Sequence, residues 1–211
     1  MKTLVQCDFD GTITEEDVSF FLLDGFAQGD WHQILNDYKE NRISVGRFNS
    51  QAFALVRADK VALLKAIRGN IKVRKGFPEL VKYCSGKGFR LVIVSNGLEF
   101  YIRAVLEEIG LGGIEVYAAQ AEFNTDGIDV KYVGLDGEQL DDGLKEMLIQ
   151  SFLEQGYRVI YIGNGTSDVK PAMHAHGVFA TGELIDRCEE YELRCNPFDD
   201  FIDVVEALES L

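Results

Sequence analysis

Cationic side chains, prolines and long apolar runs are all scarce in this chain of 211 residues. Its 21 Lys and Arg stand against 35 Asp and Glu, a formal net charge of -14, so we expect no nucleic-acid partner. No apolar run approaches the roughly 18 residues of a membrane span, and the amino-terminal run already reaches Asp8. We therefore expect no membrane partner and no signal peptide.

The four cysteines form no CxxC pair and no Cys/His cluster with zinc spacing. Free thiols are typical of a reducing compartment, so we expect a cytoplasmic protein. Hydrophobic residues make up 46% and charged residues 27% of the chain, the balance of a globular protein. The length suits one large domain, or one domain with an insert.

Short apolar runs rich in Val, Ile and aromatic residues recur along the chain, a pattern typical of strands covered on both faces. These runs span residues 3–7, 89–95, 157–163 and 177–181, with a further candidate at 114–120. Helical patterns at 77–88, 98–110 and 143–156 separate them. The alternation predicts an α/β fold with a doubly wound parallel sheet.

Residues 15–75 interrupt this alternation, because they contain no convincing buried strand. Four stretches there each indicate a helix, at 16–28, 30–41, 44–57 and 59–70. Such an insert is far longer than an ordinary strand–helix loop. We therefore predict a helical cap domain over 15–75 and a core domain formed by 1–14 and 76–211. Alternation around Asp126-Gly127 also predicts a small β-hairpin within 121–133.

Polar side chains stand at the carboxyl ends of three predicted strands, where open parallel sheets collect ligands. The first strand ends at Asp8 and Asp10, the second at Ser95-Asn96-Gly97, and the third at residues 163–168. Carboxylates that converge without histidine or thiolate suit a hard cation such as Mg²⁺. A hydroxyl and backbone amides at a helix start bind phosphate oxygens, and an aspartate can attack phosphorus to form an aspartyl-phosphate.

These stretches resemble the four motifs of the haloacid dehalogenase superfamily. "DFDGT" at 8–12 resembles the first motif, "VIVSNG" at 92–97 the second, and "YIGNGTSD" at 161–168 the acidic fourth. Lys145 stands where the third-motif lysine belongs. The resemblance spans nearly the whole chain. It implies that Asp8 is the nucleophile and Asp10 the general acid and base, with Lys145 also catalytic.

The resemblance also implies where phosphate and metal bind. The expected phosphate-binding residues are Ser95, Asn96, Gly97 and Lys145. The expected metal ligands are Asp8, Asp10 through its main-chain carbonyl, Asn164 and Asp168. The fourth motif usually opens with Gly-Asp, whereas this chain has Gly163-Asn164. An asparagine oxygen still ligates Mg²⁺ but removes one negative charge, which leaves Asp168 to ligate directly or through water.

A helical insert between the first and second motifs is the arrangement of the phosphoserine phosphatase-like branch. The stretches at 7–17, 26–31, 72–81 and 94–102 look most like the enol-phosphatases of bacterial methionine salvage. Asp17 occupies the place of a glutamate that meets the substrate amine in phosphoserine phosphatases. We therefore expect Asp17 to influence substrate specificity, with a weaker preference for an amine.

The function implied is a Mg²⁺-dependent phosphomonoester hydrolase acting on a small phosphorylated metabolite, such as an enol-phosphate or a phosphoserine-like compound. A phosphotransferase or mutase would use the same core. A binding protein with an impaired site is a third reading, and Asn164 is its only support. Lys131 and Lys170 compete with Lys145 for the lysine role, and the sequence leaves a homodimer open.

Overall fold

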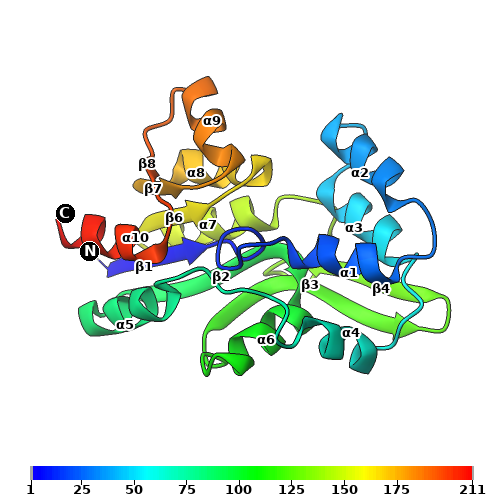
Figure 1. Ribbon diagram of the computed structural model, residues 1–211. Helices are drawn as coiled ribbons and strands as arrows, with labels where there is room; N and C mark the ends of the chain where they lie inside the picture. Colours follow the sequence, from blue (N-terminus) through cyan, green and yellow to red (C-terminus); the bar gives the residue numbers. More distant parts are fainter. Residues whose placement is uncertain (1, 211) are drawn as a thin grey trace.

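The computed structural model describes residues 2–210, so the predicted domain limits at residues 1 and 211 lie outside the described residues. Eight strands in this part of the chain form one sheet in the order β5-β4-β3-β2-β1-β6-β7-β8 (Figure 1). The strands are β1 Lys2–Cys7, β2 Arg90–Leu98, β3 Glu115–Asn124, β4 Gly127–Val133, β5 Gln139–Leu140, β6 Tyr157–Gly163, β7 Gly177–Ala180 and β8 Asn196–Pro197. The six strands from β3 to β8 in this order run parallel, whereas β4 and β5 pair antiparallel.

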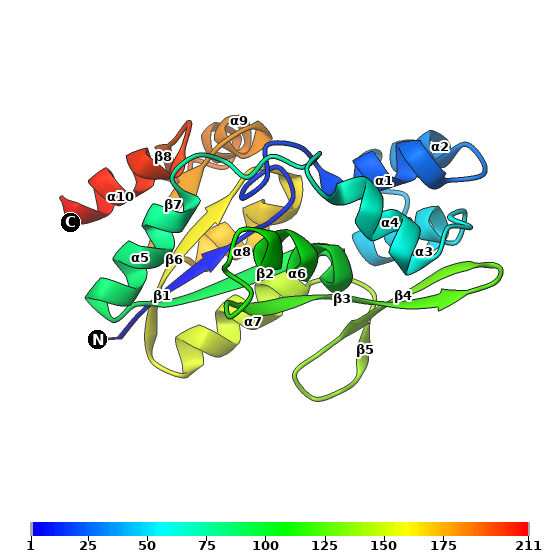
Figure 2. The same ribbon diagram turned by 60° about the horizontal axis from the view of Figure 1, so that its bottom comes forward.

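Helices cover both faces of this sheet, which confirms the predicted doubly wound α/β fold. Helices α5 (Phe77–Lys87) and α6 (Glu99–Glu108) lie on one face, and α7 (Leu144–Glu154) and α8 (Val169–His174) on the other (Figures 1 and 2). Helix α9 (Glu183–Glu190) follows β7, and α10 (Phe201–Glu209) packs on α5 through the Phe77 and Phe201 rings, 5.3 Å apart. None of the helices in residues 2–210 has both the length and the apolar composition to cross a membrane.

The central strand β1 has the buried, unalternating character that its sequence predicts. Leu4, Val5 and Cys7 are each fully buried, because β1 pairs with β2 on one side and β6 on the other while helices cover both faces. Val5 lies opposite Leu91 of β2 and Ile160 of β6. Burial of such aliphatic side chains is the main stabilising term of the core, and it fixes the register that places Asp8 at the sheet edge.

Strand β3 corrects one detail of the prediction. A strand over 114–120 followed by a separate hairpin over 121–133 was expected, but β3 is continuous from Glu115 to Asn124. Its first half pairs parallel with β2, and its second half pairs antiparallel with β4. The apolar pattern changes from continuous to alternating at the point where β3 changes its pairing strand from β2 to β4. It therefore does not mark the end of the strand.

The insert contains the four predicted helices. They are α1 Val18–Phe26, α2 Trp31–Lys39, α3 Val45–Phe53 and α4 Lys60–Ile67. Each begins after a side chain that accepts a hydrogen bond from a main-chain N–H of the first turn, which offsets the unpaired donors there. These capping residues are Asp17, Asp30, Ser44 and Asp59. The limits 15–75 for an independent cap domain stay a prediction.

Helix α3 rests on the extended β3–β4 hairpin, so the insert lies above the carboxyl ends of the central strands (Figure 1). Ser50 Oγ donates to the carbonyl of Val130 at 3.4 Å, and the Arg57 guanidinium donates to the carbonyl of Asp126. Gly46 lies so close to the loop before α7 that a Cβ there would meet the Asp141 carbonyl oxygen at 2.2 Å. The β3–β4 hairpin thus supports the helical insert through its contacts with α3.

Candidate active site

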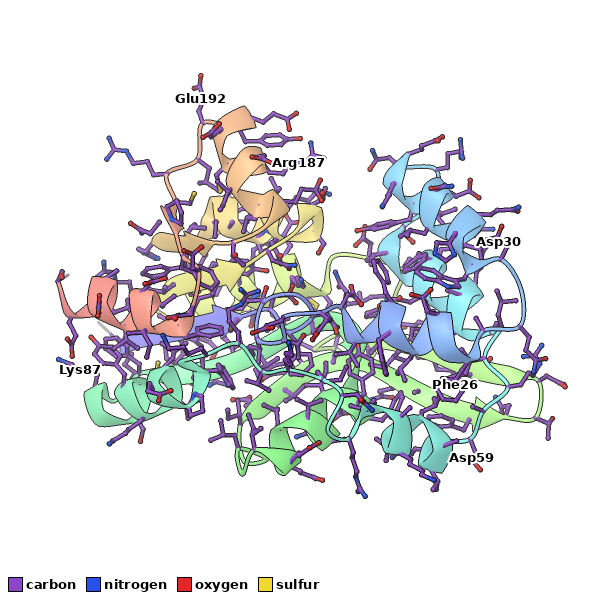
Figure 3. All side chains as sticks on the ribbon, viewed as in Figure 1. Phe26, Asp30, Asp59, Lys87, Arg187 and Glu192 are labelled. Carbon is purple, nitrogen blue, oxygen red and sulfur yellow. The ribbon has the colours of Figure 1, made fainter. Side chains whose placement is uncertain are left out.

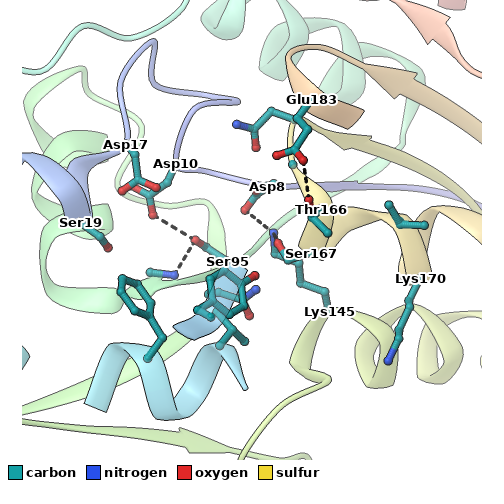
Figure 4. A pocket seen from close by; sticks show the side chains of 18 of the residues that line it. Asp8, Asp10, Asp17, Ser19, Ser95, Lys145, Thr166, Ser167, Lys170 and Glu183 are labelled. Carbon is teal, nitrogen blue, oxygen red and sulfur yellow. Dashed lines mark hydrogen bonds and ion pairs between the residues drawn. The ribbon is translucent and has the colours of Figure 1, made fainter. Parts of the chain in front are cut away.

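A cavity of about 880 Å³ lies between the carboxyl ends of the central strands and the helical insert (Figure 4). All the predicted site residues except Asp168 line it. The insert contributes an aromatic wall that includes Phe20, Tyr38 and Phe48. At the outer rim Arg187 projects from α9 and is ion-paired with Glu183 and Glu190, each at 2.8 Å (Figure 3).

The first motif forms a tight turn at the end of β1. The Asp8 N–H donates to the Ile162 carbonyl at 2.9 Å, which extends the ladder between β1 and β6 by one more bond. The N–H groups of residues 12–14 all point to the Phe9 carbonyl. Gly11 has a φ of +72°, and a Cβ there would lie 2.2 Å from Asn164 Nδ2. The turn therefore needs glycine, and it brings the first and fourth motifs together.

Lys145, in the first turn of α7, is buried between two carboxylates. Its Nζ lies 2.8 Å from Asp8 Oδ1 and 2.7 Å from Asp168 Oδ1, with only 3% of the residue exposed. Burial works against the ammonium charge, but the carboxylates of Asp168 and Asp8 outweigh it and raise the pKa of Lys145. Among the competing lysines, Lys131 pairs with Glu122 on the hairpin at 3.0 Å, and Lys170 lines the cavity from α8.

Asp168 is fully buried, and both of its oxygens are occupied by donors of the protein. Oδ1 accepts from Lys145 Nζ at 2.7 Å and Tyr161 Oη at 2.6 Å, while Oδ2 accepts from the N–H groups of Asn164 at 3.0 Å and Gly165 at 2.9 Å. Burial opposes its ionisation, but Lys145 and these hydrogen bonds lower its pKa. Four donors fill the acceptor capacity of a carboxylate, so this arrangement leaves no room for a metal ion on Asp168.

The remaining carboxylates are crowded and poorly compensated. Burial, and then the charge of Asp168, raise the pKa of Asp8 to about 7. Burial and the neighbouring Asp17 raise the pKa of Asp10 well above its ordinary value, and burial raises that of Asp17 to about 6. Within residues 2–210, Lys145 is the only cation ion-paired with any of these four aspartates. A cation bound beside Asp8 and Asp10 would offset this excess of negative charge.

Acidic side chains alone do not form a site for a hard cation here, so a metal ion at this place would also need neutral oxygen ligands. In the described chain, no cluster of three or more His, Cys, Asp or Glu side chains has the arrangement of a metal site. Asn164 supplies a neutral oxygen at the cavity, where its Oδ1 accepts from Thr12 Oγ1 at 3.1 Å. Oxygen donors of the kind that suits Mg²⁺ would be the Asp8 carboxylate, the main-chain carbonyl of Asp10 and this amide oxygen.

The second motif lies in the last part of strand β2, where the pairing with β3 is irregular, and the helical insert helps to hold it. The Gly97 N–H donates to Ser95 Oγ at 2.9 Å, and Ser95 Oγ contacts Asp10 Oδ2 at 3.4 Å. Asn49 of α3 donates through Nδ2 to the Asn96 carbonyl at 2.8 Å. Residues 95–97 are therefore positioned by both the core and the insert.

Asp17 lies beside Asp10 at the start of α1 (Figure 4). Its Oδ1 accepts from the Phe20 N–H at 2.9 Å, so it caps the helix as well as lining the cavity. Sequence reasoning did not identify Tyr101, Tyr161 and Asn49, whose polar groups hold the site residues in place. Both tyrosines lie in apolar stretches of the sequence that are typical of core residues. Only their position near the carboxyl end of a strand could have indicated a hydrogen bond to a site residue.

Comparisons with known proteins agree with this geometry. The family model for haloacid dehalogenase-like hydrolases matches residues 5–173. A 2-hydroxy-3-keto-5-methylthiopentenyl-1-phosphate phosphatase from Geobacillus kaustophilus is 30% identical over 210 residues, covering 97% of this chain and 94% of the relative. The enzyme of the same name from Bacillus pumilus is 28% identical over 207 residues, covering 96% and 89%.

Solved structures show the same fold. A phosphoserine phosphatase in a phospho-aspartyl intermediate analogue form superposes with a TM-score of 0.72 at 16% identity, covering 100% of this chain and 99% of that one. A phosphoserine phosphatase from T. onnurineus also gives 0.72, at 20% identity, covering 100% and 96%. The resemblance predicted from the motifs is confirmed. The chain therefore belongs to the haloacid dehalogenase-like hydrolase family, and within it is a phosphatase.

Proposed function

We propose that this chain is a Mg²⁺-dependent phosphomonoesterase that hydrolyses a small phosphorylated metabolite through an aspartyl-phosphate on Asp8. The observation that carries the proposal is the buried contact of Asp8 with Lys145, which Asp168 holds from the other side. A carboxylate paired with an ammonium at the bottom of a cavity can approach an anionic phosphate, because the ammonium offsets the repulsion between the two anions.

Each residue of the site takes one part in this reaction. Asp8 attacks phosphorus while the bond to the leaving oxygen breaks, and Asp10 gives its proton to that oxygen. Ser95 and the amide groups of residues 95–97 bind phosphate oxygens. Asp10, now a carboxylate, then takes a proton from the water that attacks phosphorus and releases Asp8.

Mg²⁺ would be held by Asp8, the main-chain carbonyl of Asp10 and Asn164. When bound, the ion neutralises phosphate charge and orients the ester. Asp168 has another task in this proposal, because its oxygens already accept four hydrogen bonds. It orients Lys145 and the start of the fourth-motif loop. The proposal therefore keeps Asn164 from the predicted set of metal ligands and omits Asp168.

An Asn164→Asp variant tests this assignment. If Asn164 is a ligand, the added negative charge should lower the half-saturating Mg²⁺ concentration by about 10-fold, because hard cations favour anionic oxygen. The maximal rate need not rise, since a further carboxylate also repels the substrate phosphate. A magnesium titration of phosphatase activity in both proteins provides the measurement. Identical half-saturating concentrations would show that residue 164 does not reach the metal.

The substrate that we propose is an enol-phosphate like that of the named bacterial relatives. The aromatic wall supports a ligand with an apolar part, because the Tyr38 and Phe48 rings stack at 5.6 Å and Phe20 meets Phe48 edge-on at 6.3 Å. A phosphoserine-like substrate is supported only by Asp17 beside Asp10, and the carboxylate of Asp17 is already engaged as a helix cap.

Phosphate release from a panel of esters, with Mg²⁺ and with a chelator, tests the function. The panel should contain the enol-phosphate of the relatives, phosphoserine and a generic aryl phosphate. We expect turnover of the aryl phosphate only with Mg²⁺, and the highest kcat/KM for the enol-phosphate. Product analysis with an added acceptor alcohol separates hydrolysis from phosphoryl transfer. Absence of any turnover with Mg²⁺ would contradict the proposal.

We also propose a reducing, cytoplasmic setting for this enzyme. All four cysteines are free, and Cys7, Cys84 and Cys188 are buried. Free buried thiols persist where disulfides do not form. Cys7 directly precedes the proposed nucleophile, and its Sγ donates to the Asp8 carbonyl at 3.3 Å.

A further inference from the structure

Asp10 is held from two sides, by the core and by the helical insert. Its Oδ2 accepts a hydrogen bond from Tyr101 Oη at 2.6 Å, and its Oδ1 accepts from the Val18 N–H at 3.0 Å. Tyr101 belongs to α6 of the core, whereas Val18 opens α1 of the insert. The carboxylate that the proposed mechanism uses for proton transfer therefore has one fixed orientation as long as both parts keep their places.

Tyr101 is itself oriented by a second hydroxyl. Ser19 Oγ lies 2.7 Å from Tyr101 Oη, and both residues are buried, Tyr101 completely and Ser19 to 5% exposure. The single hydroxyl proton of the tyrosine is directed at Asp10, so Ser19 must be the donor to Tyr101. The three side chains form a chain of hydrogen bonds from α1 through α6 to the turn after β1.

The neighbouring last part of β2 leaves room for this contact only because residue 97 is glycine. A Cβ at Gly97 would lie 1.9 Å from Tyr101 Oη and 2.2 Å from Asp10 Oδ2. The phenol and the carboxylate thus meet directly beside the proposed phosphate-binding residues 95–97. Ser95 Oγ donates to the same Asp10 oxygen at 3.4 Å.

We infer that Tyr101 is a positioning residue for Asp10, oriented by Ser19, and that it stabilises the carboxylate left when Asp10 protonates the leaving oxygen. The inference rests on the proposed function, since it needs Asp10 as the general acid. A phenol donates more strongly to a carboxylate than to a neutral carboxylic acid. The contact therefore gains strength as the proton leaves Asp10, which favours the transition state over the bound substrate.

Two aryl esters that differ only by a para-nitro group separate this role from a structural one. 4-Nitrophenolate leaves readily without being protonated, whereas phenolate is a poor leaving group that needs a proton from Asp10. Only the hydrolysis rate of phenyl phosphate should therefore depend strongly on Asp10. In a Tyr101→Phe variant we expect kcat/KM to fall about 10- to 100-fold for phenyl phosphate, the worth of a hydrogen bond to a charged group. For 4-nitrophenyl phosphate we expect a loss of no more than about 3-fold. Equal losses for the two esters would overturn the inference.

Tyr132→Phe is the matched control, because it removes another buried phenolic hydroxyl near residues 95–97. Tyr132 Oη contacts Asn49 and the Asn96 carbonyl but not Asp10. Any loss in this variant should therefore be the same for both esters. A dependence on the leaving group as large as that of Tyr101→Phe would count against a special role for Tyr101.

Ser19→Ala provides a second variant that does not change the tyrosine. We expect a smaller loss with the same preference for phenyl phosphate, and no additional loss when it is combined with Tyr101→Phe, because Ser19 acts through Tyr101. Additive losses, or a Ser19→Ala loss equal for both esters, would overturn the chain of contacts. If the wild-type enzyme hydrolyses neither ester with Mg²⁺, the proposed function fails first, and this result is distinct from equal losses in the variants.

Discussion

An Asp8→Asn variant is expected to lose at least about 10⁴-fold of its phosphatase activity while keeping its fold. An amide has the shape of the carboxylate but cannot form an acyl phosphate. Its oxygen can still accept from Lys145 Nζ, which lies 2.8 Å from Asp8 Oδ1. Because burial disfavours the charge at this position, the neutral side chain should not lower the melting temperature of the metal-free protein.

Asp59→Asn is a matched control for this change. Asp59 caps α4, away from the cavity, and asparagine caps a helix as well as aspartate does. Both activity and melting temperature should therefore stay close to those of the wild type. Activity of Asp8→Asn above about one tenth of the wild-type value would show that another group attacks phosphorus, since the loss expected for a nucleophile is far larger.

Lys145→Met should lower kcat/KM by about 10²- to 10³-fold, the second largest effect that we expect. The ammonium offsets the repulsion between Asp8 and the incoming phosphate, and methionine fills similar space without charge. The change also leaves Asp8 and Asp168 without their shared partner in a buried place, so thermal stability should fall. Rates should be compared at a temperature at which circular dichroism shows both proteins to be folded.

Lys131→Met is the control for the lysine assignment. Lys131 lies on the hairpin, is half exposed, and pairs with Glu122 rather than with an aspartate of the cavity. Exposed pairs of this kind contribute little, so its loss should leave kinetics and stability nearly unchanged. If Lys131→Met lost activity and Lys145→Met did not, the assignment of Lys145 would be wrong, and the phosphate would have to bind beside the hairpin.

Much of the fold could be predicted because its strands carry strong local patterns. The first apolar run predicts a strand that is buried on both faces, and in the structure its residues Leu4, Val5 and Cys7 are completely buried. The elements β5, β8, α8, α9 and α10 were not predicted. The two-residue strands and the six-residue helix α8 carry too few residues to show a period, whereas α9 and α10 are as long as the predicted helices of the insert and were missed. Strand β3 was split in two because its burial changes midway.

The site residues could be found in the sequence where they follow a strand, and not where they depend on packing. Asp8 directly follows β1, and Ser95 lies in the last part of β2, which runs three residues further than predicted. Their place at the carboxyl edge of the sheet follows from parallel topology. Tyr101 reaches Asp10 only because α6 packs against the turn after β1, and no pattern in the sequence fixes that contact. Likewise, the four donors on Asp168 come from three separate elements, and only the assembled fold shows that they leave no ligand position.

Chemical trapping of the phosphorylated enzyme tests the role of Asp8 most directly. Excess enzyme is mixed with an aryl phosphate and Mg²⁺, quenched in acid within milliseconds, reduced with borohydride and digested for mass spectrometry. We expect homoserine at position 8, formed by reduction of an acyl phosphate, in the wild type and in none of the Asp8→Asn peptides. Product formation at quench times at which residue 8 is never modified, or modification of a different residue, would contradict an aspartyl-phosphate on Asp8.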